Sequence, residues 1–194
     1  VQNGRAIIAK YAGGDITAAP TWTQDLGELQ GGGAIGGLAV SGGKLYVSGA
    51  TSNADLTAGG AAGIANAASG GVEAFVFSLT DNGASASADR ITYVGTSATD
   101  TAGAVTVGAD GTVYLTGSTT GTFAGAQRNI EKVTNAFVSA INPDGSIGWT
   151  KQFGGASGVS TGAGVAIDAS GSSMLDALGL PRGTITVDKS VELT

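Results

Sequence analysis

The chain has 194 residues, of which 42% are hydrophobic and only 12% charged, so it can fill a core and is too apolar for a solvated disordered segment. Its net charge is −6 and its nine Lys and Arg residues lie far apart, which disfavours nucleic acid and anionic membranes as partners. Cysteine and histidine are absent, which excludes disulfides, zinc or copper sites built on these residues, and Ser/His/Asp or Cys/His catalysis.

The first predicted elements form a unit of four short strands. Apolar and small residues recur at strand spacing between glycine-rich turns. The strands are predicted over residues 6–10, 22–27, 37–40 and 44–49.

The same unit recurs in the middle of the chain. Ala6 and Ala74 are separated by the same number of residues as Tyr46 and Tyr114, and such regular spacing marks a repeat architecture. Turn signals over 81–83 and 110–111 fit, because Asn and Gly adopt positive φ at low cost. The four strands are predicted over 74–79, 90–95, 104–107 and 112–117.

A third copy follows and keeps the order of the unit through three strands. Trp22 and Trp149 occupy the same slot of the unit, which Arg90 takes in the second copy. Residues 142–145, Asn-Pro-Asp-Gly, are a turn signal. The strands are predicted over 136–141, 147–154 and 164–167.

The pattern changes after Gly171, where a fourth strand is expected. Ser173 and Asp176 resemble a capping box, which predicts a short helix over 173–178 and then a new strand over 184–187. Earlier in the chain, long connectors of small residues cover 52–72 and 118–135, with one helical turn expected over 64–68. They are expected to be surface loops packing lightly on their own strands, or ligand-facing loops.

The motifs of the second and third units resemble the bacterial SBBP β-propeller repeat. They read "GTVYLTGSTTGTF" and "AFV…NPDGSIGWTKQFGG…GAGVAIDASG", and the resemblance covers residues 6–171. It departs in the connectors and in the missing final strand. The resemblance implies a secreted or surface propeller without assigned catalysis. The segment 175–185 also resembles a linker of regulatory, flagellar-associated propeller proteins from bacterial flagellar loci.

We therefore predict an all-β fold of antiparallel four-stranded blades, each unit forming one sheet of a partial β-propeller. Residues 1–171 hold about three repeats, near 6–56, 74–123 and 136–171, and residues 172–194 are a linker or the start of a further domain with a short helix and strand. Because three blades do not close a ring, we expect a piece of a longer protein or partners that cover the ends.

No residue is assigned a catalytic, cofactor-binding or metal-binding role. Asp81, Asp110, Asp144 and Asp168 recur at turn positions, where turn chemistry accounts for them. No facing carboxylate pair for glycoside hydrolysis stands out. Calcium, which takes oxygen ligands, is the only plausible metal, and no calcium-loop motif is present.

Five aromatic residues are candidates for stacking on sugars if they form an exposed row. Their equivalent places in the repeat favour packing between blades instead. They are Trp22, Tyr46, Tyr93, Tyr114 and Trp149.

The chain is thus expected to be a non-enzymatic scaffold, extracellular or at a bacterial surface, that binds protein partners or copies of itself. Flagellar or filament association is the more specific expectation. The alternative is a carbohydrate-binding or accessory domain of a secreted polysaccharide-active protein. No nucleic acid, cofactor or membrane span is expected, since the longest apolar stretches have only strand length.

Overall fold

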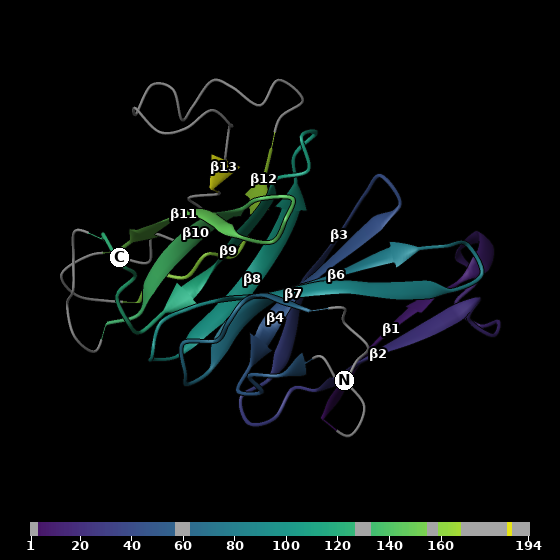
Figure 1. Ribbon diagram of the computed structural model, residues 1–194, viewed down its shortest axis with the longest axis horizontal. Helices are drawn as coiled ribbons and strands as arrows, with labels where there is room; N and C mark the ends of the chain where they lie inside the picture. The colour runs from purple at the N-terminus through teal and green to yellow at the C-terminus, as the bar shows by residue number, and fades with distance from the viewer. Residues whose placement is uncertain (1–3, 57–62, 127–132, 155–158, 168–185, 188–194) are drawn as a thin grey trace.

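The computed structural model describes residues 4–56, 63–126, 133–154, 159–167 and 186–187, and these residues form an all-β fold (Figure 1). They include one short 3-10 turn, Ala12–Gly14. The strands are β1 (Arg5–Lys10), β2 (Trp22–Glu28), β3 (Ala34–Ser41), β4 (Lys44–Thr51), β5 (Ile64–Asn66), β6 (Glu73–Asp81), β7 (Ala86–Val94), β8 (Asp100–Val107), β9 (Val113–Thr119), β10 (Asn135–Ile141), β11 (Ile147–Phe153), β12 (Val165–Ala166) and β13 (Thr186–Val187). The predicted fold class, all-β with antiparallel sheets, is confirmed.

Two central sheets contain most of the strands. The first sheet has the order β3-β4-β6-β7-β5, and the second sheet has the order β8-β9-β10-β11. Neighbouring strands are antiparallel, except that β5 runs parallel to β7. The predicted helical turn over 64–68 is therefore wrong: Ile64–Asn66 instead adds a short strand along the outer edge of β7.

The sheets and the sequence units are out of phase, so the prediction that one unit forms one sheet is wrong. Each central sheet joins the third and fourth strands of one unit to the first and second strands of the next. The cause is the pairing of β4 with β6, in which residues 44–51 lie opposite residues 73–80 without a bulge. β9 pairs with β10 in the same way.

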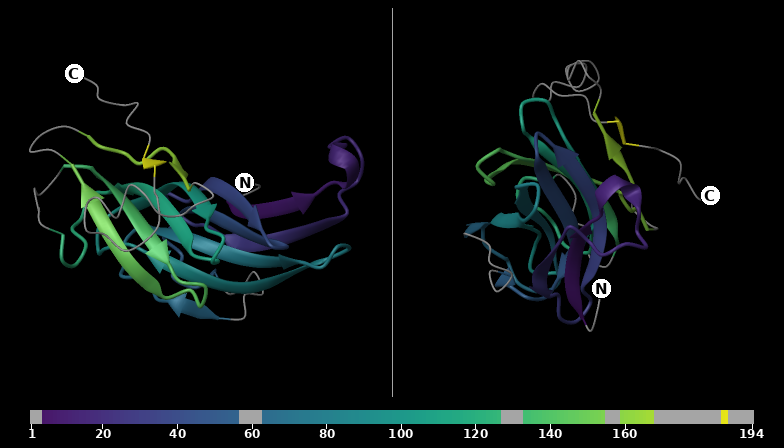
Figure 2. Two further views of the ribbon diagram at one scale, coloured as in Figure 1. Left: turned by 90° about the horizontal axis from the view of Figure 1, so that it is seen from above. Right: turned by 90° about the vertical axis from the view of Figure 1, so that its right-hand side faces the viewer.

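A pair of strands lies at each end of the described chain. The N-terminal hairpin consists of β1 and β2, and the C-terminal pair consists of β12 and β13. Figure 2 shows the purple hairpin at one end of an elongated, curved molecule and the green strands β10 and β11 at the other. The helix predicted over 173–178 lies outside the described residues, whereas residues 186–187 of the predicted final strand form β13.

Three apolar layers hold the strand groups together, because alternate residues of a strand face opposite sides of its sheet. Phe75, Phe77 and Leu79 of β6 pack in one cluster with Trp22 and Leu26 of the hairpin. The intervening residues of β6 pack in a second cluster with the second sheet. A third, smaller cluster joins the second sheet to β12.

The inner strands β3 and β8 of the two central sheets approach closely. A Cβ atom at Gly36 of β3 would collide with the carbonyl oxygen of Ala102 in β8. Glycine at this position thus lets β3 and β8, the inner strands of the two central sheets, come close to each other.

Candidate functional site

The recurring aspartates are turn residues wherever the structure describes them. Asp110 accepts hydrogen bonds from the backbone N–H and hydroxyl of Thr112, both at 2.9 Å. Asp144 does the same for Ser146, at 2.9 and 2.6 Å, and these bonds are the main reason that its pKa is lowered. Asp168 lies outside the described residues. The turn interpretation of Asp110 and Asp144 is confirmed.

Asp81 has a second role that the sequence did not indicate. Its carboxylate accepts the backbone N–H of Gly83 at 2.9 Å, as a turn residue does. It also pairs with Lys10 of β1 at 2.6 Å and accepts the indole N–H of Trp22 at 3.1 Å. The hydrogen bond from Lys10 is the largest cause of its lowered pKa. Asp81 therefore fastens the N-terminal hairpin to the turn between β6 and β7.

Two residues of the Trp slot, Trp22 and Arg90, face the turn of the next strand group. Trp22 lies opposite Lys10, Arg90 opposite Ser78, and Trp149 opposite Ala140, so the register confirms that the three are equivalent. The charge of Arg90 helps to lower the pKa of Asp144, in the turn between β10 and β11. Trp22 and Arg90 thus serve contacts with the turn of the neighbouring sheet, whereas Trp149 contacts Tyr114 of its own sheet.

The five candidate aromatics do not form an exposed row. Trp22, Tyr93 and Tyr114 are buried, and Tyr46 and Trp149 are half-buried. The Tyr93 hydroxyl donates to the carbonyl of Asn53 at 2.8 Å and accepts the N–H of Leu56 at 3.0 Å. Trp149 packs against Tyr114 with ring centroids 6.3 Å apart. Packing within the three apolar clusters accounts for these side chains.

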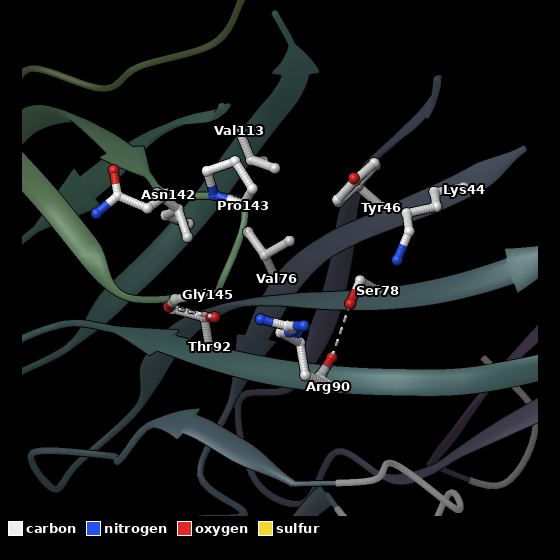
Figure 3. Close-up of a pocket in the computed structure, with 11 residues that line it drawn as sticks. Lys44, Tyr46, Val76, Ser78, Arg90, Thr92, Val113, Asn142, Pro143 and Gly145 are labelled. Atoms are coloured by element: carbon white, nitrogen blue, oxygen red, sulfur yellow. Dashed lines mark hydrogen bonds between the residues drawn. The ribbon is translucent and has the colours of Figure 1, made fainter. Parts of the chain in front are cut away.

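A small cleft opens between the two central sheets. Figure 3 shows Lys44, Tyr46, Ser78 and Arg90 on its first-sheet side, with Asn142, Pro143 and Gly145 of the β10–β11 turn opposite. The Thr92 hydroxyl donates to the carbonyl of Gly145 at 2.9 Å across the cleft. The interior volume is about 30 Å³, which suits water molecules and is far below the size of a small-molecule site.

Two buried carboxylates meet where the first sheet gives way to the second. Glu73 is 1% exposed and accepts the N–H of Ser69 at 2.7 Å, while its other oxygen, Oε2, has no hydrogen-bond partner in the described structure. Asp100, fully buried, accepts the N–H of Thr96 at 2.7 Å. Gly95 leaves room for both, since a Cβ there would touch the two carboxylates.

The environment of this pair disfavours charge. Burial raises the pKa of Glu73 to about 7, with a further contribution from the negative charge of Asp100, and burial also raises the pKa of Asp100. Sequence reasoning missed both residues. The only available signal was that Glu73 directly precedes an apolar strand.

Four large apolar side chains at the two ends of the molecule are more exposed than their equivalents inside it. Leu38 and Val40 of β3 are 54% and 67% exposed, whereas Val105, which takes the place of Leu38 in the second sheet, is 8% exposed. Ile7 of β1 is 41% exposed, while Phe75 and Phe137 at the same place in β6 and β10 are fully buried. At the other end, Phe153 of β11 is 49% exposed.

The described residues offer little for other kinds of site. They contain no group of three or more Asp or Glu side chains that could hold a metal ion. In the same residues, no helix is long and apolar enough to cross a membrane. The features that remain are the small cleft and the apolar ends of the molecule.

Comparison with known proteins gives a clear relative for most of the chain. No protein-family model matches the chain. The chain is 36% identical over 169 residues to Regulatory protein FlaEY of Caulobacter vibrioides, a match that covers 87% of the chain. The matched region spans only 17% of the length of that relative. The chain is therefore similar to one region of a much longer regulatory protein.

Proposed function

We propose that this chain is a non-enzymatic protein-binding module of a flagellum-associated regulatory protein. The observation that carries the proposal is the 36% identity to Regulatory protein FlaEY over 87% of the chain. A role in flagellar regulation accords with the flagellar-locus resemblance of segment 175–185. Extracellular or cell-surface placement is part of the proposal and follows from the SBBP-like motifs.

The arrangement of functional groups supports binding rather than catalysis. The aspartates serve turns and sheet contacts, and the cleft between the central sheets is far below the size of a small-molecule site. Exposed apolar side chains gather at the ends of the sheet stack, where a protein surface would cover them. These features favour a scaffold that presents sheet ends and edges to other proteins.

Propeller-type organisation is also part of the proposal. Apart from the added edge strand β5, the two central sheets share one order of third, fourth, first and second strands, and their inner strands β3 and β8 approach each other closely. Blades of a propeller are four-stranded sheets that pack around a common axis in this manner.

A motility experiment tests the flagellar role. The coding segment for residues 4–167 is deleted in frame in the organism that carries the gene, and swimming in soft agar and flagellar filaments per cell are measured. We expect reduced swimming and an altered filament number, both restored by the wild-type segment. Unchanged motility and filament number would contradict the proposal.

A glycan array tests the carbohydrate alternative. We expect the purified chain to bind no glycan, because the candidate aromatics are used in packing. Strong glycan binding that is lost in Trp149→Ala, and retained in the control Ile64→Ala on the outer edge strand, would replace the scaffold proposal with the carbohydrate one.

A further inference from the structure

The cleft between the two central sheets gathers positive charge. Its lining includes two basic side chains, Lys44 and Arg90 (Figure 3), and no Asp or Glu among the described residues. Lys44 is paired with Asp89 at 2.9 Å. The side chain of Arg90 is half-buried, and no described residue forms an ion pair or a hydrogen bond with its guanidinium. Because a guanidinium that loses water needs acceptors for its N–H groups, the cleft favours an anion beside Arg90.

The turn opposite Arg90 does carry a carboxylate, but this group is used elsewhere. Asp144 lies in the turn between β10 and β11, where it accepts the backbone N–H and the hydroxyl of Ser146. It is exposed and does not line the cleft. The charge of Arg90 helps to lower the pKa of Asp144 without forming an ion pair with it. Asp144 therefore does not satisfy the N–H donors of Arg90.

The neighbouring interface shows which group occupies the equivalent place. Lys10 and Trp22 lie opposite each other in the N-terminal hairpin, and both bond the carboxylate of Asp81 in the first sheet. Ser78 and Arg90 hold the same two places in the first sheet. At both interfaces, a cation and a second polar side chain on opposite strands thus face the turn of the next strand group. At the first interface, that turn supplies a carboxylate.

Pro143 holds the place of Asp81 in the second sheet. The spacing of the repeat aligns the two residues, and their contacts agree. The N–H of Asp81 donates to the carbonyl of Gly43 at 2.9 Å. Pro143 lies against Gly111, which is the residue equivalent to Gly43 in the repeat. Proline has no side-chain acceptor, so the second sheet does not supply at this place the carboxylate that the first sheet supplies.

The cleft has room for one carboxylate group. Its interior volume is about 30 Å³, and one water-sized group needs roughly 10–15 Å³, so two such groups fit. The two oxygens of a carboxylate have about this size, and they match the two parallel N–H donors that a guanidinium presents. A whole small molecule is too large for this space, whereas the end of one side chain fits it.

We propose that the cleft binds the carboxylate of one Asp or Glu side chain from a protein partner, with Arg90 as the main anchor and Lys44 adding charge at the rim. The bound carboxylate takes the part that Asp81 plays beside Lys10 and Trp22. This use of an aspartate side chain within the molecule favours a protein over a free anion as the source. The net charge of −6 does not prevent the contact, since charges farther away than about 8 Å are screened at physiological ionic strength. The inference deepens the proposed function and rests on it in taking the partner to be a protein.

Titration with a charged peptide tests the site, with binding followed by two-dimensional NMR of the purified chain. The probe is a short peptide, blocked at both ends, whose only charge is one Asp side chain, and its control carries Asn instead. We expect the Asp peptide to shift the backbone amide resonances of the cleft saturably at millimolar concentration, and the Asn peptide to bind at least roughly tenfold more weakly. Arg90→Gln should lose the binding. Arg5→Gln, which removes a guanidinium already paired with Asp25, should keep it.

Filling the cleft from within the chain gives an independent test. Pro143→Asp places a carboxylate where the first sheet has Asp81, so it should pair with Arg90 and weaken binding of the Asp peptide at least roughly tenfold. Pro143→Asn introduces a side chain of the same size without the charge and is the matched control, which should bind the peptide like wild type. Far-ultraviolet circular dichroism should show that all variants keep their strand content.

Three results would overturn the inference. They are the absence of a saturable shift at any concentration that the Asp peptide reaches in solution, binding that survives Arg90→Gln, and equal binding by Pro143→Asp and Pro143→Asn. Titration with inorganic phosphate separates the sources of the anion, because binding of phosphate without binding of the Asp peptide would replace the protein side chain with a free anion. None of these outcomes changes the motility result, so the two proposals fail separately.

Discussion

Two interfaces of the molecule use the same strand positions with different side chains. One lies between the N-terminal hairpin and the first sheet, and the other lies between the two central sheets. The first is filled by large residues such as Phe77, Leu79 and Tyr93. The second is filled mainly by Ala and Val, with the ring pair Phe123 and Phe137 at 5.1 Å. The repeat therefore determines which strand positions face the neighbouring sheet, whereas the side chains that fill the space differ between the two interfaces.

The polar contacts differ between the two interfaces as well. Lys10, Trp22 and Asp81 fasten the hairpin through an ion pair and an indole hydrogen bond. Between the central sheets, the Thr92 hydroxyl bonds the carbonyl of Gly145. Where the first sheet gives way to the second, Glu73 and Asp100 are buried, while Asn135 and Ser160 hold the equivalent places one unit later. Equivalent positions of the repeat are thus expected to contribute differently to the free energy of unfolding, and substitutions can measure the difference.

The largest difference is expected at the position shared by Phe77 and Ser139, both fully buried. Phe77→Ala removes a ring from the hairpin interface and should lower the free energy of unfolding by about 3–5 kcal/mol. Ser139→Ala loses only a hydroxyl contact to Thr150 at 2.7 Å and should cost about 1 kcal/mol. Urea unfolding of both variants measures the comparison, and equal losses would show that the two interfaces are filled alike.

The second difference concerns pH. The folded-state pKa of Glu73 is about 7 and its ordinary value is 4.5, so folding penalises the ionised form. The stability that depends on a neutral Glu73 is therefore fully present below about pH 4.5, where the carboxyl is protonated in both the folded and the unfolded state. It is lost as pH rises toward and through 7. Glu73→Gln stays neutral and should raise the free energy of unfolding at pH 8 by on the order of 3 kcal/mol.

The pH dependence of this gain separates it from a packing effect. Urea unfolding from pH 4 to pH 8 should show Glu73→Gln and wild type converging at the acid end. Asn135→Asp, which places a carboxyl at the equivalent site of the next unit, should produce the opposite trend and destabilise the protein as pH rises. A gain from Glu73→Gln that is the same at every pH would contradict the raised pKa.

A smaller difference is expected within the Trp slot. Trp22→Phe loses the indole hydrogen bond to Asp81 in a buried site and should cost about 1–2 kcal/mol. Trp149→Phe, in the same slot but half-buried, should cost about 0.5 kcal/mol or less. Thermal unfolding of the two variants at one pH compares them directly. Equal losses of stability in the two variants would contradict the expectation that Trp22 is held more tightly than Trp149.

The strand positions could be predicted from the sequence because local signals are strong there. Alternating apolar residues and turns such as 142–145 place each strand of the repeated units within a few residues of its observed bounds, whereas β5 in the connector was missed. The slot shared by Trp22, Arg90 and Trp149 was also correct, since the register places all three opposite equivalent residues. Turn roles for Asp110 and Asp144 followed from the same local chemistry.

The pairing between units could not be predicted in this way. A sequence unit does not say whether its fourth strand pairs with its own first strand or with the next one, because both pairings satisfy the same alternation. The long connector over 52–72 allows the observed choice, in which β4 lies beside β6. The buried pair Glu73 and Asp100 depends on that choice too, since its members come from different sheets. For the same reason, the exposure of Leu38 and Phe153 became visible only in the structure.

The smallest effect is expected at the rim of the cleft between the central sheets. Lys44 pairs with Asp89 at 2.9 Å, but the Lys44 side chain is nearly half exposed, so solvent and salt screen the attraction. Lys44→Gln should change the free energy of unfolding by about 0.5 kcal/mol or less at low salt, and by less still at high salt. Urea unfolding at two salt concentrations checks this, with Thr92→Val as the matched cleft variant.

Because the Thr92 bond to Gly145 is buried and joins the two sheets, its loss should cost about 1 kcal/mol regardless of salt. A salt-sensitive Thr92→Val or a costly Lys44→Gln would mean that charge at the rim, rather than the buried bond, holds the central sheets together at this cleft.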